Sequence, residues 1–244
     1  EYSSEYLFDV EFANNGTTTY GGQVGTIDGV QTPNNLYWSA VWSTQEFYET
    51  YDPADLRRDN IARFKYVYDD NQNLVKEDLS SEPIYYAYKF RHALTEEGRG
   101  PGWANWANPI NFPIIRLADV YLMLAECYNE IGNQPKAVEY INKVRARAGI
   151  ALLNSGPSYL AANSKDEVFQ RIFRERAYEL AGEGIRDSDL RRWKLSHTLL
   201  NREEYGITGK RLLTRVFREN RDYLWPIPAT EIEINGSLEQ NPNW

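Results

Sequence analysis

The chain has 244 residues, enough to bury a sizeable core as one large domain or two small ones. Its formal net charge of −8 gives no summed positive field to hold phosphates, which argues against a nucleic-acid-binding protein. Cys127 is the only cysteine, so an internal disulfide is excluded, and we predict a buried, inert thiol. No signal peptide or membrane-spanning stretch is visible, and because the chain starts without Met we expect a fragment or a processed form.

The first 112 residues predict short strands separated by long loops. Alternating apolar and polar residues indicate strands at 6–12, 61–68, 74–76 and 85–90, the first of them half-buried. A short helix is expected over 44–51 and ends before Pro53. Asp69, Asn71 and Asn73 resemble the start of a calcium-binding loop. Leu74 occupies the required Gly position, however, and we predict a hairpin turn there.

The stretch 113–149 predicts two antiparallel helices. Its first half, from Ile114 to Ile131, is apolar almost all the way round a helix, so we expect this helix to be buried on several sides. Gly132 breaks the helix, and Gly149 closes the next one.

Small residues shape this hairpin. Ala125 and Ala137 allow the two backbones to approach closely, with larger apolar residues filling the space around them. The order of residues fits a tetratricopeptide hairpin, and such a hairpin needs neighbours because it cannot bury its own faces.

The last 80 residues predict further helices and an irregular tail. Ser164 and Glu167 form a capping box before an apolar-faced helix, and 187–199 is expected to be one more helix with Leu190 and Trp193 inward. The Pro-rich tail, 223–244, is expected not to be helical and to wrap over the surface. Basic residues alternate with acidic ones on these helices, and we expect a solvated, salt-bridged face. Its members are Arg171, Arg174, Glu175, Arg176, Glu179, Glu183, Arg191, Arg192 and Lys194.

Several blocks of this half resemble the SusD/RagB family. They occur in the family's order over roughly the last 130 residues. They are 113–126, 131–133, 141–149, 175–186, 189–193, 223–228 and 240–244.

The resemblance implies a surface-exposed lipoprotein of the outer membrane of Bacteroidetes-type bacteria. Such proteins capture glycans or other nutrients and pass them to a SusC-like TonB-dependent transporter. We expect this chain to be the C-terminal half of such a protein, without the lipid anchor. The implied fold is mainly α, with tetratricopeptide-like helical hairpins, long irregular loops and a few short β-strands. We expect 1–244 to form one unit, with a loop-rich part (1–112) and a helical scaffold with its wrapping tail (113–244).

Two aromatic-rich loops are the candidate ligand sites. Sugar rings stack on flat apolar faces, and their hydroxyls need fixed hydrogen-bonding groups. The loop at 97–112 offers both, and a second set of aromatic residues precedes it. The candidates are Trp103, Trp106, Arg99, Asn105 and Asn108 in the loop, and Tyr37, Trp38 and Trp42 before it. The alternative is that Trp103 and Trp106 plug the base of the loop against the helices.

No sequence pattern indicates catalysis, a metal or a cofactor. No nucleophile lies in a recognisable setting with a histidine, and two histidines with one cysteine do not suggest a metal site. We therefore predict an oligosaccharide- or nutrient-binding protein that does no covalent chemistry. The alternative is a tetratricopeptide-like scaffold that binds a protein and no sugar.

Overall fold

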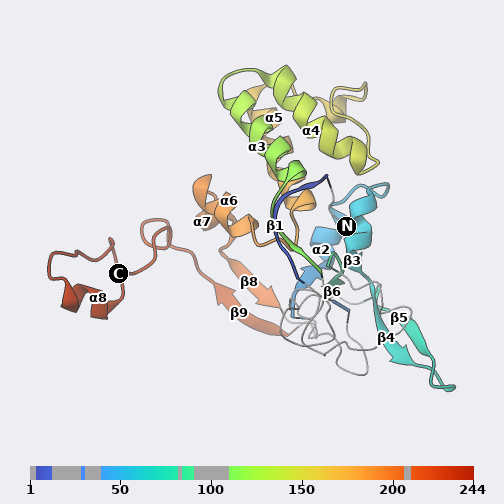
Figure 1. The fold of residues 1–244 in the computed structure, drawn as a ribbon, viewed down its shortest axis with the longest axis horizontal. Coiled ribbons are helices and arrows are strands. Elements are labelled where there is room, and N and C mark those ends of the chain that lie inside the picture. Colours follow the sequence, from blue (N-terminus) through green and yellow to red (C-terminus); the bar gives the residue numbers. More distant parts are fainter. Residues whose placement is uncertain (1–3, 13–28, 31–39, 82–83, 91–109, 206–209) are drawn as a thin grey trace. The chain divides into compact units, whose positions relative to one another are not determined.

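The computed structural model describes residues 4–12, 29–30, 40–81, 84–90, 110–205 and 210–244. The chain divides into two compact units, Glu1–Gly182 and Glu183–Trp244, drawn in Figure 1. That the whole of 1–244 forms one unit stays a prediction. Among the described residues, no helix is both long and apolar enough to cross a bilayer.

Three helices form the scaffold of the first unit. They are α3 (Leu117–Glu130), α4 (Gln134–Arg147) and α5 (Lys165–Glu179). Helices α3 and α4 make the predicted hairpin, and α5 packs against both of them (Figure 1). Ala125 and Ala137 are fully buried between the helices, which confirms the close approach predicted for them.

Capping residues set the ends of these helices as predicted. Gly132 has a φ of +81°, and Asn133 caps α4 by accepting the backbone N–H of Lys136 at 3.2 Å. Gly149 follows α4 with a φ of +75°. Ser164 and Glu167 form the capping box of α5.

The predicted start of the first helix was wrong by three residues. Residues of β7 (Phe112–Arg116) pair with β1 (Tyr6–Val10) in an antiparallel ribbon, and α3 begins only at Leu117. Pro113 and the β-branched Ile114 and Ile115 favour this extended conformation. The ribbon also differs from the expected half-buried strand, because the side chains of β1 are exposed or only partly covered.

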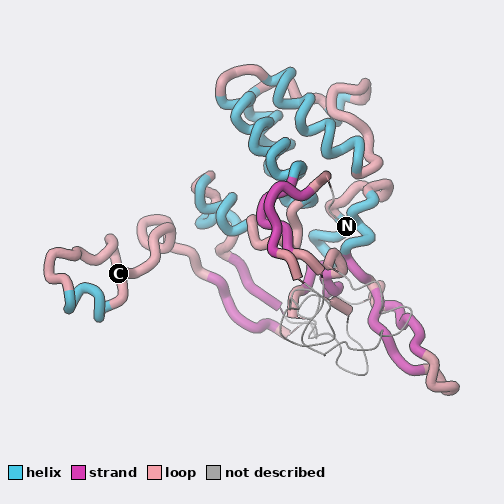
Figure 2. Tube along the Cα trace, in the orientation of Figure 1, coloured by secondary structure: helices cyan, strands magenta, loops and turns pink. Residues whose placement is uncertain are grey.

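The remaining strands of this unit make a small sheet and a hairpin, shown as magenta segments in Figure 2. The sheet has the order β2-β6-β3, from β2 (Trp42–Thr44), β6 (Ile84–Ala87) and β3 (Ile61–Ala62). The hairpin joins β4 (Phe64–Tyr68) to β5 (Leu74–Asp78). Each predicted strand is thus present, with 61–68 divided into two.

Local side-chain caps explain the two turns around these strands. Thr44 accepts a backbone N–H of the first turn of α2 (Gln45–Glu49), which is the predicted short helix. The Asp69 carboxylate accepts the backbone N–H groups of Asn71 at 2.9 Å and Asn73 at 2.7 Å. These residues therefore form the predicted hairpin turn.

The expected charged face is salt-bridged, and Arg174, Arg192 and Lys194 are exposed. The expectation that it is solvated was wrong for its buried members, which are Glu175, Arg176, Glu179 and Glu183. Arg57, in the 3₁₀ helix Leu56–Asn60, donates to Glu175 at 2.6 Å and to Glu179 at 3.2 Å. It also pairs with Asp55 at 2.7 Å. Both glutamate side chains are only 2% exposed. Arg57 lies more than a hundred positions before Glu175 in the chain, so the spacing of charges along α5 could not indicate this contact.

The second unit contains shorter elements. These are α6 (Arg186–Arg192), α7 (Ser196–Leu199), β8 (Arg202–Tyr205), β9 (Arg211–Arg215) and α8 (Ala229–Ile234). The single helix expected over 187–199 is broken at Lys194, whose φ of +58° leaves the helical region. Trp193 is partly exposed, and Leu190 is buried as predicted.

The tail contains one short helix, α8, so the expectation that the tail has no helix was wrong. Elsewhere it is irregular, and side-chain amides hold it together. Gln240 exchanges two 2.8 Å hydrogen bonds with the backbone of Ile227, and Asn241 donates to the carbonyl of Trp225 at 2.6 Å. The Trp244 indole donates to Leu224 at 3.1 Å. Two sequence blocks of the resemblance, 223–228 and 240–244, are therefore bonded to each other.

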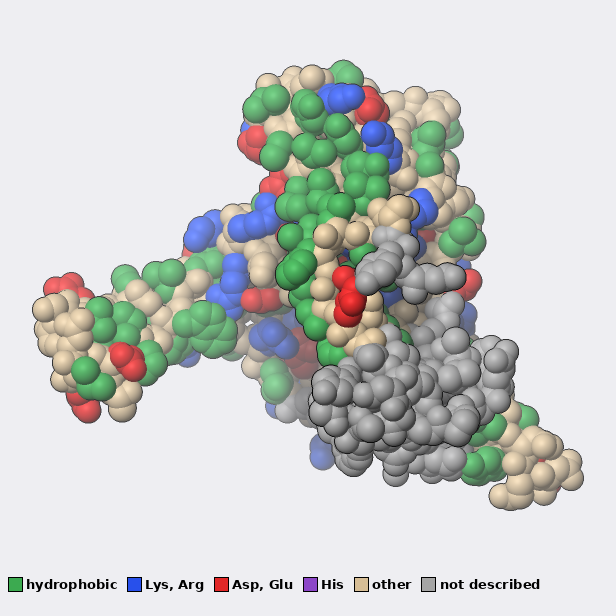
Figure 3. Space-filling model, in the orientation of Figure 1, with side chains coloured by type: hydrophobic (Ala, Val, Ile, Leu, Met, Phe, Trp, Pro, Cys, Tyr) green, Lys and Arg blue, Asp and Glu red, His purple; other side chains and the backbone are tan. Residues whose placement is uncertain are grey.

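One face of α3 departs from the prediction of burial on several sides. Leu122 and Ala125 are fully buried, but Met123 is 41% exposed and Ile131 is 75% exposed. Cys127 lies between them and is exposed, so its predicted burial was wrong. Figure 3 shows hydrophobic side chains gathered in a band over α3 and the β1–β7 ribbon.

Candidate functional site

The described residues include one of the eight predicted ligand contacts, Trp42. The other seven lie outside the described residues. They are Tyr37, Trp38, Arg99, Trp103, Asn105, Trp106 and Asn108. Their role, and the choice between platform and plug for Trp103 and Trp106, stays a prediction.

Trp42 begins strand β2 and is 45% exposed. It pairs with Tyr86 on β6, and the next pair along the ladder is Ser43 with Tyr85. Tyr85 and Tyr86 are 1% and 3% exposed, so the strand that carries Trp42 lies on a buried neighbour. An accessible indole on a strand fixed in this way can present a ring face to a ligand.

Aromatic and guanidinium groups hold the sheet beneath Trp42. The Tyr48 and Tyr85 rings meet edge-on with centroids 5.4 Å apart. The Arg63 guanidinium lies 5.2 Å from the Tyr48 ring centre and 5.4 Å from that of Tyr85. Its hydrogen bond with Tyr48 raises the pKa of Arg63. The support under Trp42 is therefore packed and charged, which restricts its movement.

Residues that flank the two aromatic-rich segments contact one another. The first segment holds Tyr37 and Trp38, and the second holds Trp103 and Trp106. The backbone N–H of Phe12, before the first segment, donates to the Asn111 side chain at 3.1 Å. Asn111, after the second segment, also donates to Asp9 at 3.0 Å. The Phe90 and Phe112 rings, on either side of the second segment, have centroids 5.6 Å apart. We call these contacts the shared root.

The first segment ends at Val41, which is hydrogen-bonded at the edge of the β2-β6-β3 sheet. The N–H of Ala87, three residues before Phe90, donates to the carbonyl of Val41 at 3.2 Å. Trp42 follows directly. The shared root thus joins the start of the first segment to the end of the second, and the Ala87–Val41 hydrogen bond places the end of the first segment beside the strand that leads to the start of the second.

Charged groups fasten this region to the end of α5. Lys89 donates to the carbonyl of Glu179 at 2.6 Å, and Arg116 donates to the same carbonyl at 2.7 Å. Arg116 also bonds the Glu179 carboxylate at 2.5 Å and Glu5 at 3.1 Å. Burial alone would raise the pKa of Glu179, but Arg116, Arg147 and Lys89 hold it below its usual value. The carboxylate therefore stays charged as the anchor of this region.

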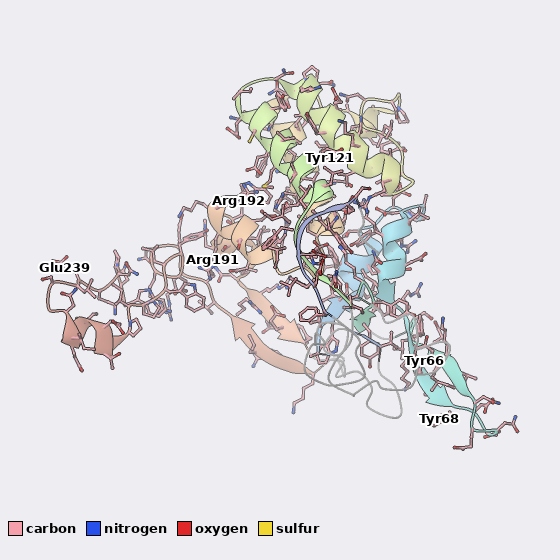
Figure 4. All side chains as sticks on the ribbon, viewed as in Figure 1. Tyr66, Tyr68, Tyr121, Arg191, Arg192 and Glu239 are labelled. Atoms are coloured by element: carbon pink, nitrogen blue, oxygen red, sulfur yellow. The ribbon has the colours of Figure 1, made fainter. Side chains whose placement is uncertain are left out.

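A second exposed aromatic lies on the β4–β5 hairpin. Tyr68 is 43% exposed, whereas Tyr66 is 5% exposed; both are marked in Figure 4. The Phe64 ring lies 5.5 Å from Tyr66 and 5.5 Å from Tyr88. The alternating pattern predicted a strand at these rings, and Tyr68 was not among the predicted ligand contacts. The sequence feature that could have indicated this aromatic surface is the presence of an aromatic residue at every second position of β4.

The described residues contain no group of three or more His, Cys, Asp or Glu side chains arranged to hold a metal ion. What they offer near the shared root is ring faces, amides and guanidinium groups. Of these, the Asn111 amide and the Arg116 guanidinium are already bonded to other residues of the chain.

Comparison with known proteins decides the family. The sequence pattern that defines the SusD family matches residues 8–244. The chain belongs to the SusD family. It is 29% identical to SusD-like protein P2 of Formosa agariphila over 97% of its own length, which is 48% of that relative. It is 36% identical to SusD-like protein P25 of the same organism over 51% of the chain and 22% of that relative.

Solved structures show the same fold. A SusD-like protein from Bacteroides fragilis aligns with a TM-score of 0.71 at 18% identity, covering 98% of this chain and 54% of the other. Surface glycan-binding protein A of Bacteroides thetaiotaomicron aligns with a TM-score of 0.68 at 21% identity, covering 100% and 53%. That protein in complex with laminarihexaose aligns with a TM-score of 0.66 at 20% identity, covering 97% and 52%. The mainly α, SusD-like fold is therefore confirmed.

The chain spans about half the length of P2 and of these solved structures.

Proposed function

We propose that this SusD-family chain binds oligosaccharide at the outer surface of the cell and delivers it to a SusC-like TonB-dependent transporter. The binding groups are the aromatic and polar side chains of the two segments that leave the shared root, together with Trp42. The protein does no covalent chemistry in this proposal, and its place at the outer membrane follows from the family.

The shared root is the observation that carries the proposal. The Phe12–Asn111 hydrogen bond joins the residues that flank two segments far apart in sequence, and the Phe90–Phe112 ring contact joins the two ends of the second segment. Together these segments hold Tyr37, Trp38, Trp103 and Trp106. A glycan contacting both segments would meet several ring faces at once, which a single loop could not provide. The complex of a structural relative with laminarihexaose supports a sugar as the ligand class.

The expected mechanism is weak capture followed by release. Indole faces stack on the C–H side of the sugar rings, and Asn105, Asn108 and Arg99 bond their hydroxyl groups. Few rings are buried in such a contact, so we expect dissociation constants on the order of micromolar to millimolar. Weak binding suits a protein that hands its ligand to a transporter.

Calorimetric titration with a glycan panel tests the proposal. The panel includes laminarihexaose and oligosaccharides of other linkages. Trp103→Ala and Trp106→Ala are each expected to weaken binding about tenfold or more, since stacking on an aromatic face is worth on the order of 1–3 kcal/mol. Affinity unchanged by both substitutions would remove this site.

Trp225→Ala is the matched control. Trp225 is 75% exposed and lies in the second unit, outside the candidate segments. It removes an exposed indole of the same size, and we expect it to leave glycan binding unchanged. Trp42→Ala then measures how much the exposed indole on β2 contributes to glycan affinity, since Trp42 is 45% exposed.

The alternative is a tetratricopeptide-like scaffold that binds a protein and no sugar. Pull-down of a defined protein by this chain, with no panel member bound even at millimolar concentration, would favour that alternative.

A further inference from the structure

The end of helix α6 places a lysine where the backbone favours glycine. Lys194 follows the helix with a φ of +58°. Its N–H donates to the carbonyl of Arg191 at 3.0 Å, and the N–H of Leu195 donates to that of Leu190 at 2.8 Å. In this pair of helix-ending hydrogen bonds glycine usually takes the left-handed position, because it has no Cβ to clash there. A lysine at this position is strained, and strained residues cluster at functional sites.

The Lys194 ammonium group lies over an aromatic ring. Its nitrogen is 4.4 Å from the centre of the Tyr223 ring. Within the part of the chain that the structure describes, Lys194 forms no ion pair with an Asp or Glu side chain. The ring positions the charge without neutralising it, so the ammonium group can bind an anion.

The Tyr223 ring that supports Lys194 is itself fixed. Its hydroxyl lies 2.8 Å from Nδ1 of His197, and its ring centre lies 4.8 Å from that of the buried Phe217. The backbone N–H of Phe217 donates to Asn201 at 2.5 Å, and Asn201 donates to the carbonyl of His197 at 2.7 Å. Tyr223 is thus held by α7 and by the segment that follows β9, which keeps the Lys194 ammonium group in place.

Two arginines add positive charge beside the same pair of rings. The guanidinium group of Arg191, marked in Figure 4, lies 5.3 Å from the centre of the Phe217 ring. Its carboxylate partner is Asp187, whose side chain is 59% exposed. Arg218 directly follows Phe217, is exposed, and has no ion pair among the described residues. The cations around the two rings therefore exceed the carboxylates that pair with them.

The sequence around these residues is basic within an acidic chain. Residues 186–221 contain ten Lys and Arg residues and five Asp and Glu residues, whereas the whole chain contains 27 and 35. Figure 3 shows Lys and Arg side chains gathered over α6 and the β8–β9 hairpin. A local excess of positive charge attracts anionic ligands that the rest of the chain repels.

We propose that this surface binds an anionic group of a saccharide, either a carboxylate or a sulfate ester. The ammonium group of Lys194 and the guanidinium groups of Arg191 and Arg218 are the binding groups, and Tyr223 positions Lys194. We call these four residues the Lys194 cluster. Ammonium and guanidinium groups form charge-assisted hydrogen bonds with both kinds of anion. That the ligand is a saccharide rests on the proposed function, and its negative charge follows from the cluster.

Calorimetry with matched saccharides tests the charge of the ligand. The 244-residue chain is titrated with tetragalacturonic acid and its methyl ester, and with a sulfated galactan tetrasaccharide and its desulfated form. We expect the acidic member of at least one pair to bind about tenfold more tightly, since charge-assisted contacts are stronger than neutral ones. That advantage should shrink as sodium chloride rises from about 50 to 500 mM, because exposed charges are screened. The pair that shows it identifies the anion.

Lys194→Gly separates binding from folding. It removes the charge and relieves the strain of the left-handed backbone. We therefore expect about tenfold weaker binding of the acidic saccharide and a melting temperature higher by about 2–4 °C. A purely structural role for Lys194 would instead lower the melting temperature. Lys194→Arg keeps a cation and should keep most of the affinity.

Lys143→Ala is the matched control. The Lys143 ammonium group lies 4.6 Å from the centre of the Tyr140 ring in the first unit, and its side chain is 43% exposed. We expect this substitution to leave the binding of every saccharide unchanged. A chain that carries both Trp103→Ala and Trp106→Ala lacks the proposed stacking residues and should keep its preference for the acidic saccharide.

Two results would overturn the proposal. One is equal affinity for the acidic and neutral members of both pairs, which would leave the proposed function standing if neutral oligosaccharides still bind. The other is an affinity for the acidic saccharides that Lys194→Gly does not change. Binding of no saccharide at all would remove the proposed function and this proposal together.

Discussion

The α3–α5 bundle and the carboxyl-terminal tail are held together by different forces. In the bundle, Leu122, Ile141 and Ile172 are fully buried. In the tail, no residue of 218–244 is buried. The tail instead uses side-chain amides, such as that of Gln240, to bond its own backbone. The bundle gains its stability from apolar area removed from water, and the tail gains its shape from specific hydrogen bonds.

The difference teaches that two kinds of sequence block within one family have different physical origins. A block in α3 reflects spacing and size, because any apolar residues of suitable volume fill such a core. The block 240–244 reflects chemical identity, because the Gln240 amide both donates to and accepts from the backbone of Ile227, which an apolar side chain cannot do. Substitutions in the two regions should therefore differ in kind as well as in magnitude.

The largest effect is expected where the bundle departs from apolar packing. Glu179→Gln removes one carboxylate from the buried ionic cluster, in which Arg57 keeps Asp55 and Glu175 and Arg116 keeps Glu5. We expect a loss of roughly 3–5 kcal/mol in the free energy of unfolding, because the positive charges buried there are then less fully compensated. Urea unfolding measures it. Glu130→Gln is the control, since its side chain is 58% exposed and pairs with Lys165 on the surface. Equal losses for the two variants would contradict the assignment.

The same carboxylate sets the acid limit of stability. Its pKa is lowered in the folded chain relative to its usual value of 4.5. The stability it contributes is therefore present above that value and is lost as the pH falls through the folded-state pKa. Unfolding free energies measured between pH 6 and 3 should decline less steeply for Glu179→Gln than for the wild type. Parallel declines would show that other carboxylates dominate.

Apolar truncation in the bundle ranks next. Ile172→Ala removes most of a fully buried side chain, and we expect a loss of roughly 3 kcal/mol from transfer and cavity terms. Ile131→Ala makes the same chemical change at a position 75% exposed in this chain, and it should stay within about 0.5 kcal/mol of the wild type. Thermal or urea unfolding gives the comparison. Similar losses would mean that α3 is covered on both sides.

A tail substitution should act locally. Gln240→Ala removes two hydrogen bonds to Ile227 and is expected to lower local stability by about 1–2 kcal/mol. Hydrogen exchange should accelerate over 223–244 and stay unchanged in α3, α4 and α5. Glu239→Ala, at the neighbouring exposed position marked in Figure 4, is the control. Acceleration throughout the chain would show that the tail and the bundle unfold together.

The smallest effect concerns the start of α5. Ser164→Ala removes one half of the capping box and should cost about 1 kcal/mol. Ser158→Ala, at an exposed position before α5, serves as the control in the same unfolding assay. A loss beyond that of Ile172→Ala would reverse the ranking of capping and burial.

Much of the bundle could be predicted because its signals are local. Gly132, Gly149 and the Ser164–Glu167 pair mark helix ends by their own chemistry, and the structure confirms each of them. The charged face of α5 could not be predicted, because its burial depends on Arg57, more than a hundred positions away. Periodicity shows that a helix is apolar on several sides, but it does not show which sides are covered. Cys127 was wrongly expected to be buried for that reason.

The same difference between local sequence signals and long-range contacts applies to the candidate site. Composition identified the aromatic-rich segments, and the ligand role of every candidate stays a prediction, including that of Trp42, for which only the exposure is described. The shared root was not predicted, since it depends on contacts such as that between Phe12 and Asn111, 99 positions apart. A search for amides next to the ends of loop-like segments could have suggested it.

The ring contact of Phe90 with Phe112 has a consequence for the history of this protein. When a contact such as that between Phe90 and Phe112 fixes both ends of a loop, doubling the length of the loop adds only about 0.6 kcal/mol of closure free energy. The closure entropy of an insertion between these two positions is therefore small. Under the proposed function, changes at this one place in the chain would alter the ligand that is recognised without redesigning the helices.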